Sequence, residues 1–185
     1  MSVPKQTSDI FEILSKGQFI CSNSTKDSNR KLYNVIDENF EELYDYFKSI
    51  NLSLDKGDEY YMFTRVENKT DLERKLLAAY KWIDILDFFK TFDHSFGAGY
   101  RFTPSDVLIR LSVDVDMKNK LEGLKKYAAG KEKHGEILEK VLDHLSRDYF
   151  IELENEITNS YKVLSSFHYM ERLVLSINIP DSVQK

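Results

Sequence analysis

The stretch LSLDKGDEYYMFTRV, residues 52–66, predicts a β-hairpin and decides the fold. Residues 52–54 and 60–66 are strand-forming runs, and Lys56-Gly57-Asp58 between them supplies the residue types that turns favour. An amphipathic helix at 28–50 precedes this hairpin, and Asp71 begins another helix after it. A helix followed by a β-hairpin is the signature of a winged helix.

The same order of elements recurs near the C-terminus. A predicted helix at 134–146 precedes strands at 150–154 and 161–164, with the turn Ile157-Thr158-Asn159 between them, and a last helix covers 170–177 with Ser166 as its N-cap. The duplication predicts a mainly α-helical α+β fold with small β-hairpins, arranged as tandem winged-helix domains. We expect a first winged-helix domain at 1–70, a connecting helix and linker at 71–98, and a second winged-helix domain at 99–185.

The composition favours a helical protein of the cytoplasm. The chain has 185 residues, of which 42% are hydrophobic and 31% charged, with only seven Gly and three Pro. We expect no membrane contact, because the chain has neither a signal peptide nor an apolar run of ~18 residues. The single Cys21 cannot form an internal disulfide and is interpreted as a small packed thiol.

One apolar stripe runs along the predicted helix at 28–50. Tyrosine side chains flank this stripe, and they suit either the edge of a core or a partner surface, because the ring packs while the hydroxyl stays wet. The stripe consists of Leu32, Ile36, Phe40, Leu43, Phe47 and Ile50. The flanking candidates for a partner or dimer interface are Tyr33, Tyr44 and Tyr46.

The predicted helix at 71–92, with Thr70 as N-cap and Glu73 completing a capping box, is apolar on more than one side. It is either a central helix shared by both winged units or the seam of a homodimer. Trp82, Phe88 and Phe89 are therefore candidates for a partner or dimer interface, and core burial is the alternative. The main stripe comprises Leu72, Leu76, Ala79, Ile83, Leu86 and Phe89, and Trp82, Ile85, Phe88 and Phe92 extend it. Further along, Thr103-Pro104-Ser105-Asp106 is a strong helix start, and helices are expected at 104–111 and 117–128.

The charge distribution limits where nucleic acid could bind. The net charge of −5 argues against a protein that coats nucleic acid by itself. Residues 28–60 are acidic, whereas residues 116–133 carry six lysines against three acids, so this stretch either meets phosphate or is a solvated helix face. The DNA-binding candidates are Lys118, Lys120, Lys125, Lys126, Lys131 and Lys133, with Arg101 and Arg110 as possible additions.

No catalytic or metal-binding pattern emerges from the sequence. The four histidines are widely separated, and none has the spacing of a zinc motif. The neighbouring Ser166 and His168 lack the glycine elbow that presents a nucleophilic serine. We therefore expect no enzyme activity, no metal and no cofactor.

Several stretches of the sequence together carry a family resemblance: GQFIC (17–21), KLYNVI (31–36), LYDYF (43–47), GDEYYMFTR (57–65), DLERKL (71–76), WID (82–84) and FTPSD (102–106). In these stretches the chain resembles MksE, the small accessory subunit of bacterial condensin-like SMC complexes, and its relative MukE, which are KITE-type proteins. The resemblance implies a tandem winged-helix fold, a stable homodimer, and attachment to a kleisin subunit and through it to an SMC ATPase acting on the nucleoid or against plasmids. The chain is short for MukE and has no obvious extension beyond Pro180, which favours the MksE branch.

Two other function classes remain open at this stage. A winged-helix transcription regulator or replication initiator shares the fold but needs a basic recognition helix. The helix at 134–146 has only Lys140 against Glu136, Glu139 and Asp143, which disfavours base readout. An enzyme of unknown type is the third possibility.

Overall fold

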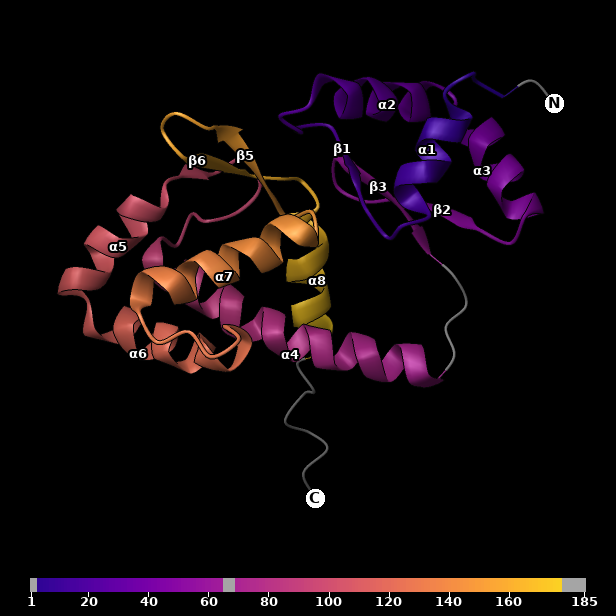
Figure 1. Cartoon of the computed structure of the whole chain (residues 1–185). Coiled ribbons are helices and arrows are strands. Elements are labelled where there is room, and N and C mark those ends of the chain that lie inside the picture. Colours follow the sequence, from indigo (N-terminus) through magenta and orange to yellow (C-terminus); the bar gives the residue numbers. More distant parts are fainter. Residues whose placement is uncertain (1–2, 65–68, 178–185) are drawn as a thin grey trace.

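The computed structural model describes residues 3–64 and 69–177, and it is mainly α-helical with two small antiparallel sheets in two lobes (Figure 1). The first lobe contains α1 (Thr7–Leu14), β1 (Ile20–Cys21), α2 (Asp27–Glu38), α3 (Phe40–Ser49), β2 (Ser53–Lys56) and β3 (Tyr60–Thr64). The second lobe contains α4 (Lys69–Phe92), β4 (Arg101–Phe102), α5 (Pro104–Val113), α6 (Val115–Gly123), the 3-10 helix η1 (Leu124–Tyr127), α7 (His134–Arg147), β5 (Ile151–Asn155), β6 (Ser160–Val163) and α8 (Phe167–Ile177).

Both predicted hairpins are confirmed, and each gains a third strand from earlier in the chain. The sheet orders are β1-β3-β2 and β4-β6-β5, and every pairing is antiparallel. Gly57 has a specific steric role in the first hairpin, because a Cβ there would overlap the ring of Tyr60. The end of the predicted first hairpin, at Arg65 and Val66, lies outside the described residues.

The predicted single helix at 28–50 is wrong, because the chain breaks at Asn39 into α2 and α3. Asn39 leaves the helical region at φ −128°, and its side-chain amide donates to the carbonyl of Val35 at 2.8 Å. The hydrophobic spacing continues across the break, so periodicity alone could not reveal it. Ile50 follows the last turn of α3 and is 47% exposed, so it does not belong to the buried stripe.

Helix α4 also differs from the prediction. It begins at Lys69, so Thr70 lies inside the helix and is not its N-cap, and the side chain of Leu72 lies outside the described residues. Leu76 is 45% exposed, whereas the buried face follows Ala79, Trp82 and the residues after them. The buried positions on α4 are Ala79, Trp82, Ile85, Phe88 and Phe89. This face turns toward α6 and α8, which pack against α4.

The predicted starts of α5 and α7 are confirmed, whereas the helix expected at 117–128 begins at Val115 and is followed by the separate 3-10 helix η1. Thr103 Oγ1 accepts a hydrogen bond from the Asp106 amide at 3.2 Å, and Asp106 Oδ2 accepts one from the Thr103 amide at 2.8 Å, so α5 begins with a complete capping box. Helix α8 begins at Phe167, three residues earlier than expected and directly after Ser166, whose hydroxyl donates to the carbonyl of Tyr149. That hydrogen bond ties the start of α8 to the end of α7.

Two apolar cores form, and the second extends into the first lobe. Tyr61 and Phe47 belong to the first core, whereas Phe19, Cys21 and Tyr60 join the larger core of the second lobe. Cys21 is 1% exposed, which confirms its interpretation as a packed thiol, and this burial raises its pKa to about 11. The lobes therefore share apolar surface.

A buried carboxylate on β5 joins the two lobes by hydrogen bonds. Glu152 accepts from the Ser24 hydroxyl at 2.9 Å, from the Thr25 hydroxyl at 2.7 Å and from the Thr25 amide at 2.7 Å. Beside it, the Asn23 side chain accepts from the Ser165 amide at 2.8 Å and donates to the Val163 carbonyl at 3.1 Å. These contacts set the orientation of one lobe against the other.

Candidate partner and nucleic-acid interfaces

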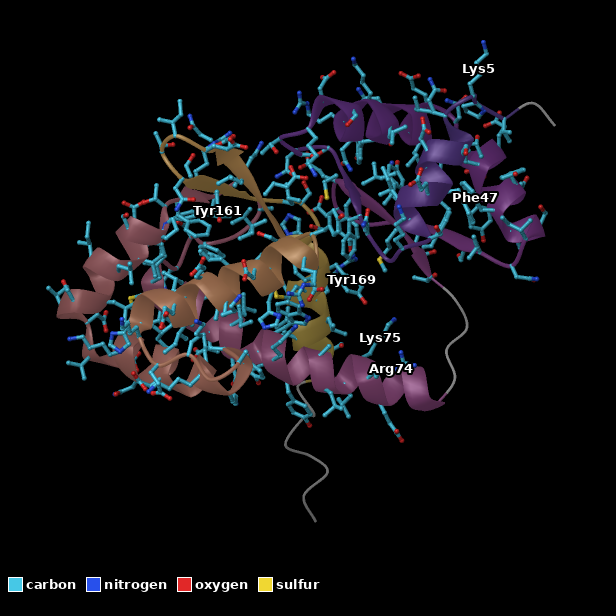
Figure 2. All side chains as sticks on the ribbon, viewed as in Figure 1. Lys5, Phe47, Arg74, Lys75, Tyr161 and Tyr169 are labelled. Atoms are coloured by element: carbon cyan, nitrogen blue, oxygen red, sulfur yellow. The ribbon has the colours of Figure 1, made fainter. Side chains whose placement is uncertain are left out.

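A cleft of about 600 Å³ lies where the two lobes face each other. The chain between α1 and β1 forms one wall, together with the end of β3. Helix α4 and the segment from the end of α7 to β5 form the other wall. Figure 2 shows Tyr169 of α8 and Lys75 of α4 on the sides of their helices that face the first lobe. We call this space the interlobe cleft.

Aromatic side chains form the floor of the interlobe cleft. Phe19 is central, since its ring centroid lies 5.4 Å from that of Tyr169 and 5.8 Å from that of Phe150. Trp82 meets Phe150 edge to face at 5.1 Å. Trp82 is only 4% exposed, so it belongs both to the core and to the cleft lining. A ligand in the cleft would meet a rigid aromatic base.

The rim of the interlobe cleft is basic although the chain is acidic overall. Lys16, Lys75 and Arg147 line it, against the single acid Asp148. Asp148 is already paired with Lys81 at 3.5 Å, and Lys81 also lies 4.0 Å over the Trp82 ring. Lys16, just beyond the end of α1, pairs with Glu12 at 2.9 Å, but both side chains are exposed and the pair contributes little to stability. The cleft therefore favours an acidic ligand.

The predicted interface residues fall into different environments. Phe88 and Phe89 are core residues, 0% and 1% exposed, and do not face solvent in the single chain. The tyrosines Tyr33, Tyr44 and Tyr46 are half-buried at the edge of the first core. These three tyrosines, out of the six predicted interface residues, therefore remain partly exposed to solvent, as a partner surface requires.

A polar contact next to Tyr33 orders this edge of the first lobe. The Tyr33 ring lies 5.1 Å from that of Tyr61, whose hydroxyl donates to Asp37 at 2.7 Å. Lys56 also donates to Asp37 at 2.7 Å. The hydrogen bond from Lys56, and to a lesser extent that from Tyr61, holds the pKa of the Asp37 carboxyl below its ordinary value. The carboxylate is thus already engaged within the lobe.

Most of the predicted DNA-binding residues are paired with carboxylates of the same chain. Lys125, for example, lies 2.6 Å from Glu122 and 2.9 Å from Glu132, and the hydrogen bonds to both raise its pKa. The remaining pairs are Lys120–Asp87 at 2.9 Å, Lys126–Asp84 at 2.8 Å, Lys131–Glu136 at 3.6 Å, Arg101–Glu154 at 2.7 Å and Arg110–Asp114 at 3.7 Å. Lys118 and Lys133 make no ion pair within the described part of the chain. The basic surplus of residues 116–133 is therefore largely offset by Asp84 and Asp87 of α4, which are distant in sequence, and by Glu136 at the start of α7.

An exposed apolar face on α5 was missed by the sequence analysis. Val107 and Leu111 of α5 are buried, but Ile109 and Val113 on the other side are 69% and 76% exposed. Val115, at the start of α6, continues this face. The sequence could have indicated this face, because apolar residues lie on both sides of a short helix. Such a pattern is typical of a helix whose second side is also covered, for example by a partner.

The family model of the condensin complex protein MksE matches residues 5–174, which span both lobes. The chain belongs to the MksE family. None of the curated proteins compared with the chain matches it. MksE is a condensin complex protein and not a known catalytic family, and its membership implies interaction with the other subunits of the complex. Among residues 3–64 and 69–177, no helix is long and apolar enough to cross a membrane, and no group of three metal-binding side chains gathers.

Proposed function

We propose that this MksE-family protein is the non-catalytic, kleisin-binding subunit of a bacterial condensin-like SMC complex of the MksBEF or MukBEF type. It acts in chromosome organisation, segregation or plasmid defence, in the cytoplasm and at the nucleoid. The family match over residues 5–174 carries this proposal. ATP hydrolysis belongs to the SMC partner, which the kleisin connects to this subunit.

We further propose that each lobe is a winged-helix domain. In each lobe a helix leads to a short strand, then to further helices and a hairpin, and the short strand pairs with the last hairpin strand. The intervening helices are α2 and α3 in the first lobe and α5, α6, η1 and α7 in the second. The proposed boundaries are 1–70 for the first domain, 71–98 for the connecting helix and linker, and 99–185 for the second domain. This repeat supports a subunit built for binding.

Co-purification with the kleisin encoded in the same organism tests the function. The tagged kleisin should retain this protein at a fixed ratio, and calorimetry should give a defined stoichiometry. Apolar and aromatic contacts should dominate, so retention should survive moderate salt. A kleisin that is folded and retains its SMC partner but not this protein would contradict the proposal.

The protein is expected to be a homodimer. Light scattering at micromolar concentration should give about twice the chain mass of 21.7 kDa. The exposed apolar face of α5 and the tyrosine edge of the first lobe supply apolar surface that association would cover. The mass should be the same in moderate salt. A strict monomer over this concentration range would contradict the dimer.

Weak, sequence-independent binding to duplex DNA is a further expected property. Lys118 and Lys133 should contribute most, because they are not ion-paired in the described structure. Reversing both to Glu should weaken binding and flatten the dependence of log affinity on log salt by roughly 0.9 per lost phosphate contact. Reversal of the paired Lys125 and Lys126 should have a smaller effect. Fluorescence anisotropy at several salt concentrations measures both.

The same titration separates the proposal from the transcription regulator or initiator. Two unrelated duplexes should bind equally, because α7 lacks the basic and amide side chains that read base edges. Lys140 of α7 is paired with Asp143 at 2.9 Å, so the carboxylate partly offsets the positive charge that Lys140 could present to DNA. A thousandfold preference for one duplex would favour the regulator.

A further inference from the structure

One edge of β3 is unpaired along its second half. Strand β2 covers the opposite edge from Tyr61 to Thr64, whereas β1 pairs only with Tyr60 and Tyr61. The chain before β1 turns away at Gly17, whose φ of 76° is a left-handed conformation that favours glycine. The edge beyond β1 is therefore open.

The main chain of Phe63 faces this open edge. The Gly57 amide donates to the Tyr60 carbonyl at 2.8 Å, so Tyr60 faces β2, while the Ser22 amide donates to the Glu59 carbonyl at 3.0 Å on the other edge. Since residues alternate along a strand, Tyr61 and Phe63 face the β1 edge and Met62 faces β2. No hydrogen bond to the Phe63 amide or carbonyl is present among the described residues beyond those of the strand pairs. Phe63 thus offers a main-chain donor and acceptor.

This open edge lies in the wall of the interlobe cleft. Met62, Phe63 and Thr64 line the cleft together with Gln18 and Phe19 of the opposite chain segment. An unpaired strand edge is a template for another extended chain, and side chains of an added strand point alternately to its two faces. Here one face of such a strand would meet the aromatic floor and the other the basic rim.

We propose that the interlobe cleft binds an extended segment of the kleisin, in which apolar residues alternate with Asp or Glu, as a strand added to β3 beyond β1. The inference rests on the proposed function and specifies its binding mode. The occupant follows from charge, because Lys16 and Arg147 line the cleft while its one acid, Asp148, is already paired with Lys81, in a chain of net charge −5. Main-chain hydrogen bonds at Phe63 give affinity, and the floor and rim select the side chains.

Amide hydrogen exchange measured by NMR, with and without the kleisin, tests the added strand. Exchange of the Phe63 amide should slow at least about tenfold on binding, because it acquires a main-chain acceptor. The Tyr61 amide, already paired with β1, and the Met62 amide, which faces β2, should change little. Kleisin binding without protection of Phe63 overturns the added strand and leaves the proposed function intact. Failure of the kleisin to bind at all overturns both.

Charge reversal at the rim tests the acidic segment. The double variant Lys16→Glu and Arg147→Glu should weaken kleisin affinity at least about tenfold by calorimetry. The matched control, Lys5→Glu with Lys133→Glu, makes the same charge change outside the cleft and should retain wild-type affinity; Figure 2 shows Lys5 on the far side of the first lobe from α4. The proposal would be overturned if the two double variants bound the kleisin with equal affinity. It would also be overturned if the rim variant lost DNA binding but kept its affinity for the kleisin.

Discussion

Replacement of Phe89 by alanine is expected to lower the free energy of unfolding by about 3–5 kcal/mol. Phe89 is 1% exposed, and its ring stacks on that of Phe96 with a centroid distance of 4.4 Å. The centroid of the Phe102 ring lies 5.8 Å from that of Phe89. Removal of the Phe89 ring leaves a cavity that the surrounding rings cannot fill without moving. Urea denaturation followed by circular dichroism measures the change.

The matched control for Phe89 is Leu77→Ala, on the same helix. Leu77 is 69% exposed, so this change should alter stability by only about 0.5 kcal/mol. A Phe89→Ala protein as stable as the wild type, but unable to bind its partner, would show that this ring serves an interface and not the core.

Replacement of Glu152 by alanine should cost about 1.5–3 kcal/mol and loosen the contact between the lobes. The change removes the acceptor shared by the Ser24 hydroxyl and by the hydroxyl and amide of Thr25. The cost arises because these donors lose a charged partner within the lobe contact, where little water can replace it. Denaturation should then broaden or separate into two transitions, one for each lobe.

Two variants control the Glu152 experiment. Glu152→Gln keeps an oxygen acceptor and should lose less stability than the alanine variant. Glu156→Ala removes an exposed acid from the turn after β5 and should change stability by at most about 0.5 kcal/mol. If Glu152→Ala unfolds in a single transition at the wild-type midpoint, the hydrogen bonds do not couple the lobes.

The sequence by itself determined the elements that depend on near neighbours. The hairpin of β2 and β3, its repeat in β5 and β6 and the capping box at Thr103 were predictable, because turns, strand alternation and helix caps are set by residues a few positions apart. The family resemblance was also visible at this level, since it consists of such local stretches.

Only the tertiary structure decided which side chains are exposed, which are buried and which charges are paired. The break at Asn39 keeps the hydrophobic period, so it leaves no trace in the pattern, and the buried face of α4 depends on where α6 and α8 pack. Lys126 pairs with Asp84 and Ser24 with Glu152, across 42 and 128 residues of chain. Folding brings together residues that are far apart in the chain, and these neighbours determine which charges are paired and which side chains are buried. For this reason sequence spacing could not predict the pairing of most lysines, the contact between the lobes or the open edge of β3.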